Sequence, residues 1–200
     1  DAADIGDIEF SARYQILSAR GDLPYLIANL SVTAPTGASP FEVPRTFTGT
    51  PLEAATGSGF WGISPSITAI SRTDPAVLFG TLGYTHNFSE DVDVVVPPVR
   101  LVAVDPGDSM DASLGIGIAL NQRTSFNLGY AHTWTFGSTT ESFLLIPGVD
   151  GFTGPIFQNP RDRQIGRLLF GTSPGISNSA TLNWSVEVGA TEDAADIRTF

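Results

Sequence analysis

Two runs of strict alternation, joined by four polar residues, constrain the fold of this chain more than any other feature. Between residues 110 and 121, large apolar side chains occupy every second position, and small or polar ones lie between them. The pattern resumes after residues 121–124 and continues to residue 136. The two apolar rows are Ala112, Leu114, Ile116, Ile118 and Leu120, then Phe126, Leu128, Tyr130, Trp134 and Phe136. A period of two places successive side chains on opposite faces of a strand, so the segment predicts a β-hairpin.

The second face of this hairpin carries Gly, Ser, Thr and Asn, whereas a sheet facing bulk water usually carries Lys and Glu. Each strand is about a dozen residues long, and a tilted strand needs roughly 9–11 residues to cross a bilayer. The hairpin is therefore typical of a transmembrane β-barrel, with an oily outer face and a small, polar inner face.

The composition favours strands and excludes several kinds of function. The chain has 21 Gly, 14 Pro and 42% hydrophobic residues, without a helical repeat, which predicts an ordered all-β protein. It has ten Arg, no Lys and 21 acidic residues, for a net charge of −11, which makes nucleic acid an unsuitable partner. Cysteine is absent, which excludes disulfides, thiolate metal sites and a Cys nucleophile.

The same alternation recurs along the chain. We expect further strands at residues 7–18, 23–34, 59–71, 76–88, 165–173 and 180–191, with the start of a ninth at 196–200. Pro65 falls inside the third of the nine strands in chain order and lacks the amide hydrogen that a ladder needs, so we expect a bulge or bend there.

Short and long connections alternate. The short ones are residues 19–22, 72–75, 121–124 and 174–179. The long ones are residues 35–58, which have no strand pattern, 89–109 and 137–164, and we expect all three to be long outer loops. Barrels have tight turns at one rim and long outer loops at the other. The prediction is one domain over residues 1–200: an antiparallel, up-and-down transmembrane β-barrel with about eight or nine strands here of about 10–12. Strand parity and the polar end of the chain predict truncation at both termini.

Several short phrases, in order and spacing, resemble a family of bacterial outer-membrane transporters labelled meta-pathway or phenol-degradation-like proteins. They are Gly-Asp-Ile-Glu at 6–9, Ala-Arg-Tyr at 12–14, Val-Thr-Ala-Pro-Thr-Gly at 32–37, Leu-Phe-Gly-Thr-Leu-Gly-Tyr at 78–84, Pro-Gly-Asp at 106–108 and Gly-Ala-Thr-Glu-Asp-Ala at 189–194. The resemblance implies a monomeric barrel of about a dozen strands, with further strands ahead of residue 6. It also implies passage of small molecules, aromatic or hydrophobic ones among them.

Polar residues at inward positions are the candidates for lining the lumen. They are Asp7, Glu9, Arg13, Asn29, Asp111, Asn127, Arg167, Asn183 and Glu187. They would orient a solute; alternatively, they form a salt-bridged, water-filled interior that only maintains the shape of the barrel.

Outward aromatic residues are the candidates for the membrane interface. They are Trp61, Tyr84, Phe88, Trp134, Phe136 and Trp184, which we expect to form a girdle at headgroup depth. A path for a hydrophobic ligand is the alternative reading of the same residues.

Metal and catalytic readings have weak support. His86 and His132 lie near strand ends but have no third ligand at a suitable spacing. Four acidic loop residues, Asp91, Asp93, Asp105 and Asp108, are weak calcium candidates without EF-hand spacing. No nucleophile elbow, phosphate loop or metalloprotease motif is present, so we expect neither an enzyme nor a cofactor.

The function that the sequence favours is passive diffusion or binding of small solutes across the bacterial outer membrane, with lipid as the surrounding partner. Two alternatives stay open. One is a structural scaffold, adhesin or filament subunit, with homo-oligomer or surface protein contacts through the loops. The other is a soluble β-sandwich that acts as a binding module.

Overall fold

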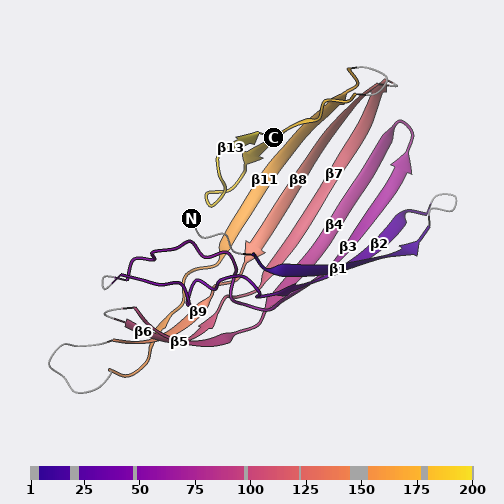
Figure 1. Ribbon diagram of the computed structural model, residues 1–200. Helices are drawn as coiled ribbons and strands as arrows, with labels where there is room; N and C mark the ends of the chain where they lie inside the picture. The colour runs from indigo at the N-terminus through magenta and orange to yellow at the C-terminus, as the bar shows by residue number, and fades with distance from the viewer. Residues whose placement is uncertain are drawn as a thin grey trace.

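The computed structural model describes residues 5–18, 23–46, 49–96, 99–121, 123–144, 153–176 and 180–199, which form two antiparallel sheets (Figure 1). Within these residues the secondary structure is β only, so the all-β antiparallel prediction is confirmed. No helix long and apolar enough to cross a membrane occurs in the part of the chain that is described.

The larger sheet has nine strands. In sheet order these are β1 (Ile8–Leu17), β2 (Tyr25–Ala34), β3 (Gly62–Thr73), β4 (Ala76–Asn87), β7 (Ser109–Asn121), β8 (Thr124–Thr135), β11 (Arg163–Pro174), β12 (Trp184–Gly189) and β13 (Ile197–Thr199). Every neighbouring pair is antiparallel, and the order follows the chain once β5, β6, β9 and β10 are set aside. These nine strands are the ones that alternation predicts.

The register keeps apolar residues beside apolar residues across the sheet. One such row runs through Leu78, Ile116, Leu128, Phe170 and Val186, each paired with the next. Because side chains alternate between faces, all residues of one cross-strand row lie on the same face. The sheet therefore has one apolar face, called here the outward face, and an opposite inner face.

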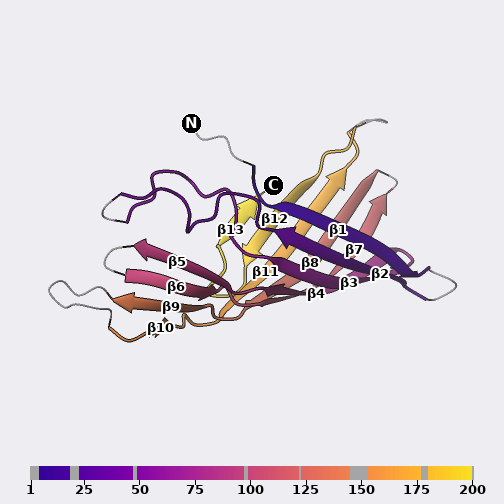
Figure 2. The same cartoon turned by 60° about the horizontal axis from the view of Figure 1, so that its bottom comes forward.

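The smaller sheet was not predicted. It contains β5 (Glu90–Val96), β6 (Val99–Asp105), β9 (Thr139–Leu144) and β10 (Ile156–Gln158), in the order β10-β9-β6-β5. These strands lie in the segments 89–109 and 137–164, which the sequence assigns to long connections. Figure 2 shows this sheet extending beyond one end of the main sheet. In the segment 35–58, only the isolated bridge Arg45–Pro51 pairs in the described residues.

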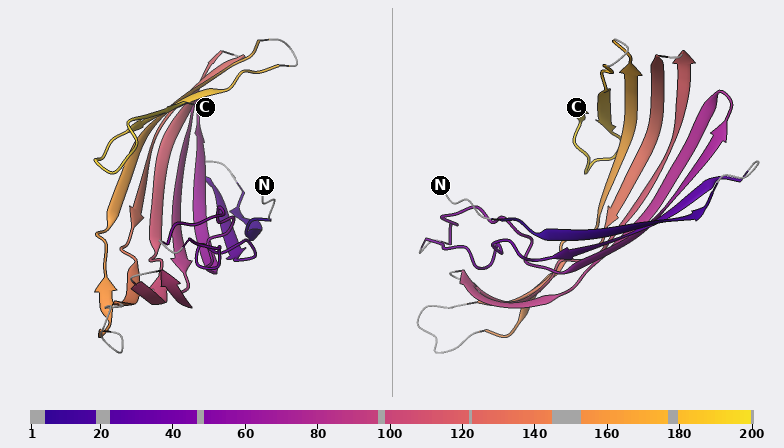
Figure 3. Two further views of the ribbon diagram at one scale, coloured as in Figure 1. Left: turned by 60° about the vertical axis from the view of Figure 1, so that its left-hand side comes forward. Right: turned by 45° about the vertical axis from the view of Figure 1, so that its right-hand side comes forward.

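The main sheet is curved and open. Its two edges are β1 and β13, so the sheets are not closed into a barrel in the described part of the chain. Figure 3 shows the β1–β2 edge twisting away from the β12–β13 edge. The right-handed twist of strands accumulates in this way across a wide sheet.

The main sheet is a single layer. Extensive contacts join only neighbouring strands of the same sheet, and no large side chain in the described residues is fully buried. The accessible surface is 13150 Å², whereas a compact monomer of 21.1 kDa would expose about 9,000 Å². The apolar rows therefore do not meet one another across a two-layer core of the kind a soluble sandwich has.

Of the bulge or bend expected at Pro65, the bulge is not present. The pairing of β3 with β2 continues through Pro65 without a shift, and its pairing with β4 resumes at Ser66 in the same register. Only Ser64 and Pro65 lack a ladder partner on β4. The side chains of Ser64 and Thr85 bridge this gap with a 3.0 Å hydrogen bond, so the missing amide is accommodated without an extra residue.

Candidate functional site

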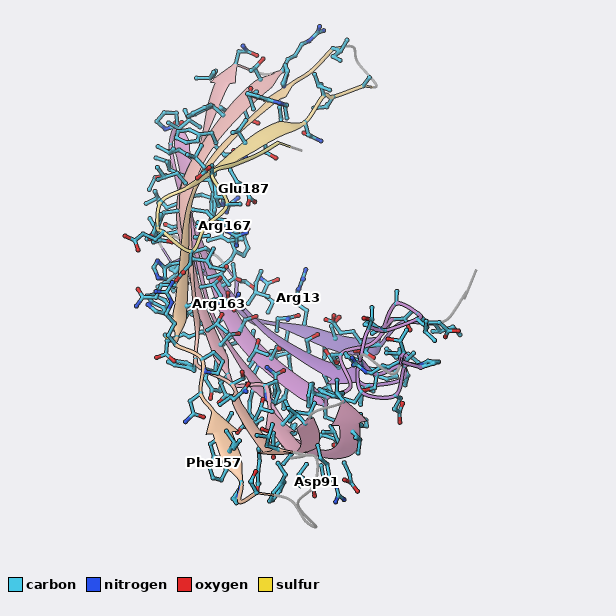
Figure 4. The ribbon with its side chains drawn as sticks, turned by 90° about the vertical axis from the view of Figure 1, so that its left-hand side faces the viewer. Arg13, Asp91, Phe157, Arg163, Arg167 and Glu187 are labelled. Atoms are coloured by element: carbon cyan, nitrogen blue, oxygen red, sulfur yellow. The ribbon has the colours of Figure 1, made fainter. Side chains whose placement is uncertain are left out.

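The charged residues of the main sheet lie on one face. From β1 to β12, every acidic or arginine residue occupies an inner position, as the pairing register shows. They are Glu9, Arg13, Arg72, Asp111, Arg163, Arg167 and Glu187. Figure 4 shows Arg13 projecting into the space enclosed by the curve of the sheet, with Arg167 and Glu187 on the same concave side. The inner face is therefore the concave and charged face.

Cross-strand hydrogen bonds hold these charges in place. Thr133 donates to Asp111 at 2.6 Å, and the Glu9 carboxylate accepts a hydrogen bond from the Ser31 hydroxyl. Arg167 Nη1 lies 3.3 Å from Glu187 Oε2, with both side chains partly exposed. Each acid is thus paired with a donor on the neighbouring strand, which fixes its direction across the concave face.

Two adjoining hollows lie on this face. The first has a volume of about 260 Å³, and its walls carry hydroxyls and charges from β1 to β11, including Asn29, Asp111, Thr133 and Arg167. The second, of about 140 Å³, shares Thr133 and Arg167 and adds Glu187. Arg167 Nε is buried and has no hydrogen-bond partner there. The arrangement provides a polar surface with both signs of charge, suited to weak contact with a polar solute.

Seven of the nine predicted lumen residues share this inner face: Glu9, Arg13, Asn29, Asp111, Asn127, Arg167 and Glu187. Their contact with solute stays a prediction. Asp7 and Asn183 instead precede β1 and β12, outside the ladder.

Asp7 clamps the segment 35–58 to the start of β1. Its carboxylate accepts hydrogen bonds from the Ser58 amide at 2.7 Å, the Ser58 hydroxyl at 2.6 Å and the Gly37 amide at 3.1 Å. The bonds from Ser58, which outweigh the effect of burial, lower the pKa of Asp7 from its ordinary value. Asp7 thus has a role in holding a connection that its inward parity does not predict.

Five of the six predicted interface aromatics gather at the end of the sheet that bears the long connections. Trp61, Phe88 and Phe136 directly flank β3, β4 and β8, while Tyr84 and Trp134 lie inside strands near the same end. Trp184 begins β12 at the opposite end. Trp61, Phe88 and Trp184 are each about half exposed, at 51%, 49% and 51%. The arrangement gives one aromatic band and a single tryptophan at the other edge of the apolar face; that both meet lipid headgroups stays a prediction.

Asp108 is a hydrogen-bonding centre at the long-connection end. It accepts from the Tyr84 hydroxyl, from the Asn87 amide at 3.2 Å, and pairs with His86 Nδ1 at 2.8 Å. Burial opposes ionisation of Asp108, but the bonds from Tyr84, His86 and Asn87 together keep its pKa below the ordinary value. The side chain therefore ties the end of β4 to the start of β7.

The metal candidates do not converge. Asp93 pairs with Arg100 at 2.6 Å, and Asp105 accepts from the Gly107 amide at 3.0 Å. His132 lies against Tyr130, with 2.7 Å between the Tyr hydroxyl and Nδ1, and is remote in the register from His86. No group of three or more potential ligands occurs in the segments that the structure describes.

The outward face carries a hollow of about 830 Å³, whose walls are almost entirely apolar. It lies where small side chains such as Ala12 and Ala28 stand between Tyr14, Leu30 and Leu82. No charged side chain points into it from this face, since Arg13 belongs to the inner face. This hollow offers no chemistry beyond apolar contact.

Sequence reasoning missed one part of the inner face. Phe79 and Leu169 are large and apolar yet lie at inner positions, in register with Gly115 and Gly129. The signal was available, because Phe79 has the same parity as Thr81, which the alternation places inward.

The family resemblance is tested by comparison with protein-family models. The model described as "Putative MetA-pathway of phenol degradation" matches residues 1–159. The match spans the ten strands β1 to β10, six of which belong to the nine-stranded main sheet. The resemblance seen in the short phrases is thereby confirmed, and the chain belongs to this family.

Proposed function

We propose that the chain forms the wall of a bacterial outer-membrane β-barrel through which small solutes, hydrophobic or aromatic ones among them, pass by passive diffusion. It acts without a cofactor and without catalysis. The observation that supports it most is the division of the described main-sheet strands from β1 to β12 into two faces. Their outward face has no acidic or arginine residue, and their inner face has all of them. Lipid tails solvate the first kind of face, and water solvates the second.

Exposure on the outward face supports the same proposal. Phe10, Tyr14 and Leu114 are exposed at 68%, 73% and 65%. Because exposed apolar surface costs about 25 cal/mol per Å² in water, a face built from such side chains is unfavourable against water. A bilayer removes that cost without requiring a second layer of protein.

A bilayer also places a demand on the sheet edges. Unpaired amides and carbonyls cannot be left in the hydrocarbon region, where each costs several kcal/mol. We therefore expect the outer edges of β1 and β13 to be paired when the protein is in a membrane. The family description, which concerns phenol degradation, supports an aromatic solute as the cargo.

Liposome swelling tests the proposal. The full chain is reconstituted into vesicles, which are diluted into isotonic arbutin, a neutral phenolic glucoside that crosses lipid slowly, or into sucrose. We expect faster swelling in arbutin than in protein-free vesicles, and recovery of the protein in the outer-membrane fraction. Purification in good yield without detergent, together with swelling equal to that of protein-free vesicles, would refute it. Ordered assemblies without solute flux would instead support a surface scaffold.

A further inference from the structure

Apolar side chains such as Ile27, Val77 and Ile165 are scattered among the polar residues of the inner face, but one cross-strand row holds both aromatic residues of this face, Tyr25 and Phe79. The row contains Tyr25, Ile70, Phe79, Gly115, Gly129, Leu169 and Glu187, one from each of seven neighbouring strands. It lies nearer the short-turn end than the charged hollows. Arg72 caps its first member, with its guanidinium carbon 5.1 Å from the centre of the Tyr25 ring. A passing solute would meet apolar side chains here and nowhere else on the inner side of these strands to the same extent.

Two glycines allow the bulky members of the row to lie flat on the sheet. A Cβ added to Gly115 would come within 2.7 Å of Phe79 Cε2, so the Phe79 ring occupies the place of a side chain there. At the paired Gly129, an added Cβ would touch Leu169 Cδ1 at 3.6 Å. Phe79 and Leu169 therefore lean toward each other from opposite sides of a floor of bare backbone.

A hollow of about 220 Å³ opens between them. Phe79, Leu169 and Gly129 provide apolar walls, and Asn127, Ser185 and Glu187 provide polar groups on the remaining sides. For comparison, a cavity of about 150 Å³ lined by apolar side chains accepts benzene. The space fits one ring with a small substituent, and the Phe79 ring offers an aromatic partner for edge-to-face or offset stacking.

The polar side of the hollow accepts hydrogen bonds and disfavours anions. Glu187 is held by Arg167 Nη1 at 3.3 Å, which orients its carboxylate. The Asn127 amide lies over Gly171, where an added Cβ would be 2.8 Å from Asn127 Cγ. A hydroxyl on the ring can donate to either oxygen, whereas a ring carboxylate would meet the like charge of Glu187.

We propose that this hollow, called here the apolar seat, is a selectivity site for small neutral molecules that combine one ring with one hydrogen-bond donor. The inference deepens the proposed passage of solutes and rests on it for its physiological meaning. The ring lies between Phe79 and Leu169, and the donor faces Asn127 and Glu187. Neutral phenols are thereby preferred over benzoates of the same size.

Fluorine NMR of 4-fluorophenol, titrated with the full chain in lipid nanodiscs and with empty nanodiscs as blank, tests the site. Phe79→Ala removes one wall and should weaken binding roughly tenfold, in keeping with the loss of an aromatic contact and its buried area. Val77→Ala is the matched control, because Val77 has the same inward parity on β4 but does not line the hollow. We expect the control to bind within about twofold of wild type.

Ser185→Leu provides a second route, since it fills the hollow from β12 without altering Phe79. This variant should abolish binding, because the added side chain takes the place of the ring. Heat-modifiable mobility in gels checks that each variant is folded. With 4-fluorobenzoate, binding should be weaker than with the phenol, and Glu187→Gln should narrow the difference. The seat is overturned if wild type binds no more than empty nanodiscs, or if Phe79→Ala and Val77→Ala behave alike.

Swelling in sucrose and arbutin separates this result from the proposed function. If the protein swells vesicles but shows no Phe79-dependent binding, the proposed pore function stands and the apolar seat is refuted. If the protein binds 4-fluorophenol through Phe79 but swells no vesicles, the apolar seat stands and the proposed pore function is refuted.

Discussion

A single arginine at Leu114 tests whether the outward face meets lipid. Leu114 lies on β7, is 65% exposed, and pairs with Tyr130 on β8. Tyr130 stands midway between Phe126 and Trp134, roughly 13 Å along the strand from each at about 3.3 Å per residue. Leu114 would therefore lie near the bilayer midplane, the most costly depth for a charge.

The expected cost follows from that depth. Arginine at the midplane of a barrel destabilises folding by about 2–4 kcal/mol, and near the interfaces by about 0–1 kcal/mol. Leu114→Arg should thus lower the folding equilibrium constant by roughly 30- to 700-fold at 1.4 kcal/mol per tenfold. Leu120→Arg, near the end of β7 where the pairing with β8 shifts, should cost much less. On a sheet face exposed to water, neither substitution would cost more than about 0.5 kcal/mol.

Urea titration of the full chain folded in phosphatidylcholine vesicles, followed by tryptophan fluorescence, measures these differences. Ser113→Arg is the matched control, because Ser113 is the adjacent residue on the inner face. We expect it to cost less than about 1 kcal/mol, with Asp111 two positions away as a counter-charge. Equal costs at Leu114 and Ser113, or no cost at Leu114, would refute the assignment of the outward face to lipid.

Three further predictions concern the polar contacts. Hydrogen bonds lower the pKa of Asp7, so its contacts with residues 35–58 are fully formed above about pH 4 and are lost as the pH falls through the folded pKa. Protease cleavage of that segment should therefore rise with acidification. In the Asp7→Ala variant the segment should be cleaved rapidly at every pH. Asp108→Asn should speed hydrogen exchange where β4 meets β7, since the amide retains only part of the acceptor capacity, and unchanged exchange there would argue against its role. Arg167→Gln should lower the free energy of unfolding by at most about 1 kcal/mol, because the ion pair with Glu187 is partly solvated. The same variant should shift single-channel ion selectivity toward cations. An unchanged reversal potential would count against a lumen position for Arg167.

Local alternation determined most of the main sheet. A period of two fixes which residues share a face, so the nine strands, their antiparallel order and the inward position of Arg167 and Glu187 follow from the sequence. The short turns fix the order, because two strands joined by a few residues can only pair with each other. Phe79 shows the limit of this inference. Its position in the alternation places it on the inner face, but a large apolar side chain was not expected on that polar face.

The long segments show what the sequence could not determine. β5 pairs with β6 inside one long connection and β9 with β10 inside the next. Only the pairing of β6 with β9 joins the two connections, which the whole hairpin at 110–136 separates in the chain, so this pairing is set by tertiary proximity and not by local pattern. An irregular register also hides β5 and β6 from a search for alternation, because their pairing shifts near Asp93, a residue with positive φ. The prediction of a bulge at Pro65 was wrong for a related reason. The neighbouring strands on both sides hold the register, so the missing amide removes one ladder hydrogen bond without shifting the register.

The inner face shows most clearly what the sequence determined and what the tertiary structure determined. The alternation alone assigned each strand residue to the apolar or the polar side, because side-chain direction is a property of the extended backbone. Only the tertiary register could align Phe79, Gly115, Gly129 and Leu169 in one row and open a hollow between them, since cross-strand neighbours depend on how far each strand slides past the next. The same register decided that Asp7 and Asp108 hold connections in place at the strand ends.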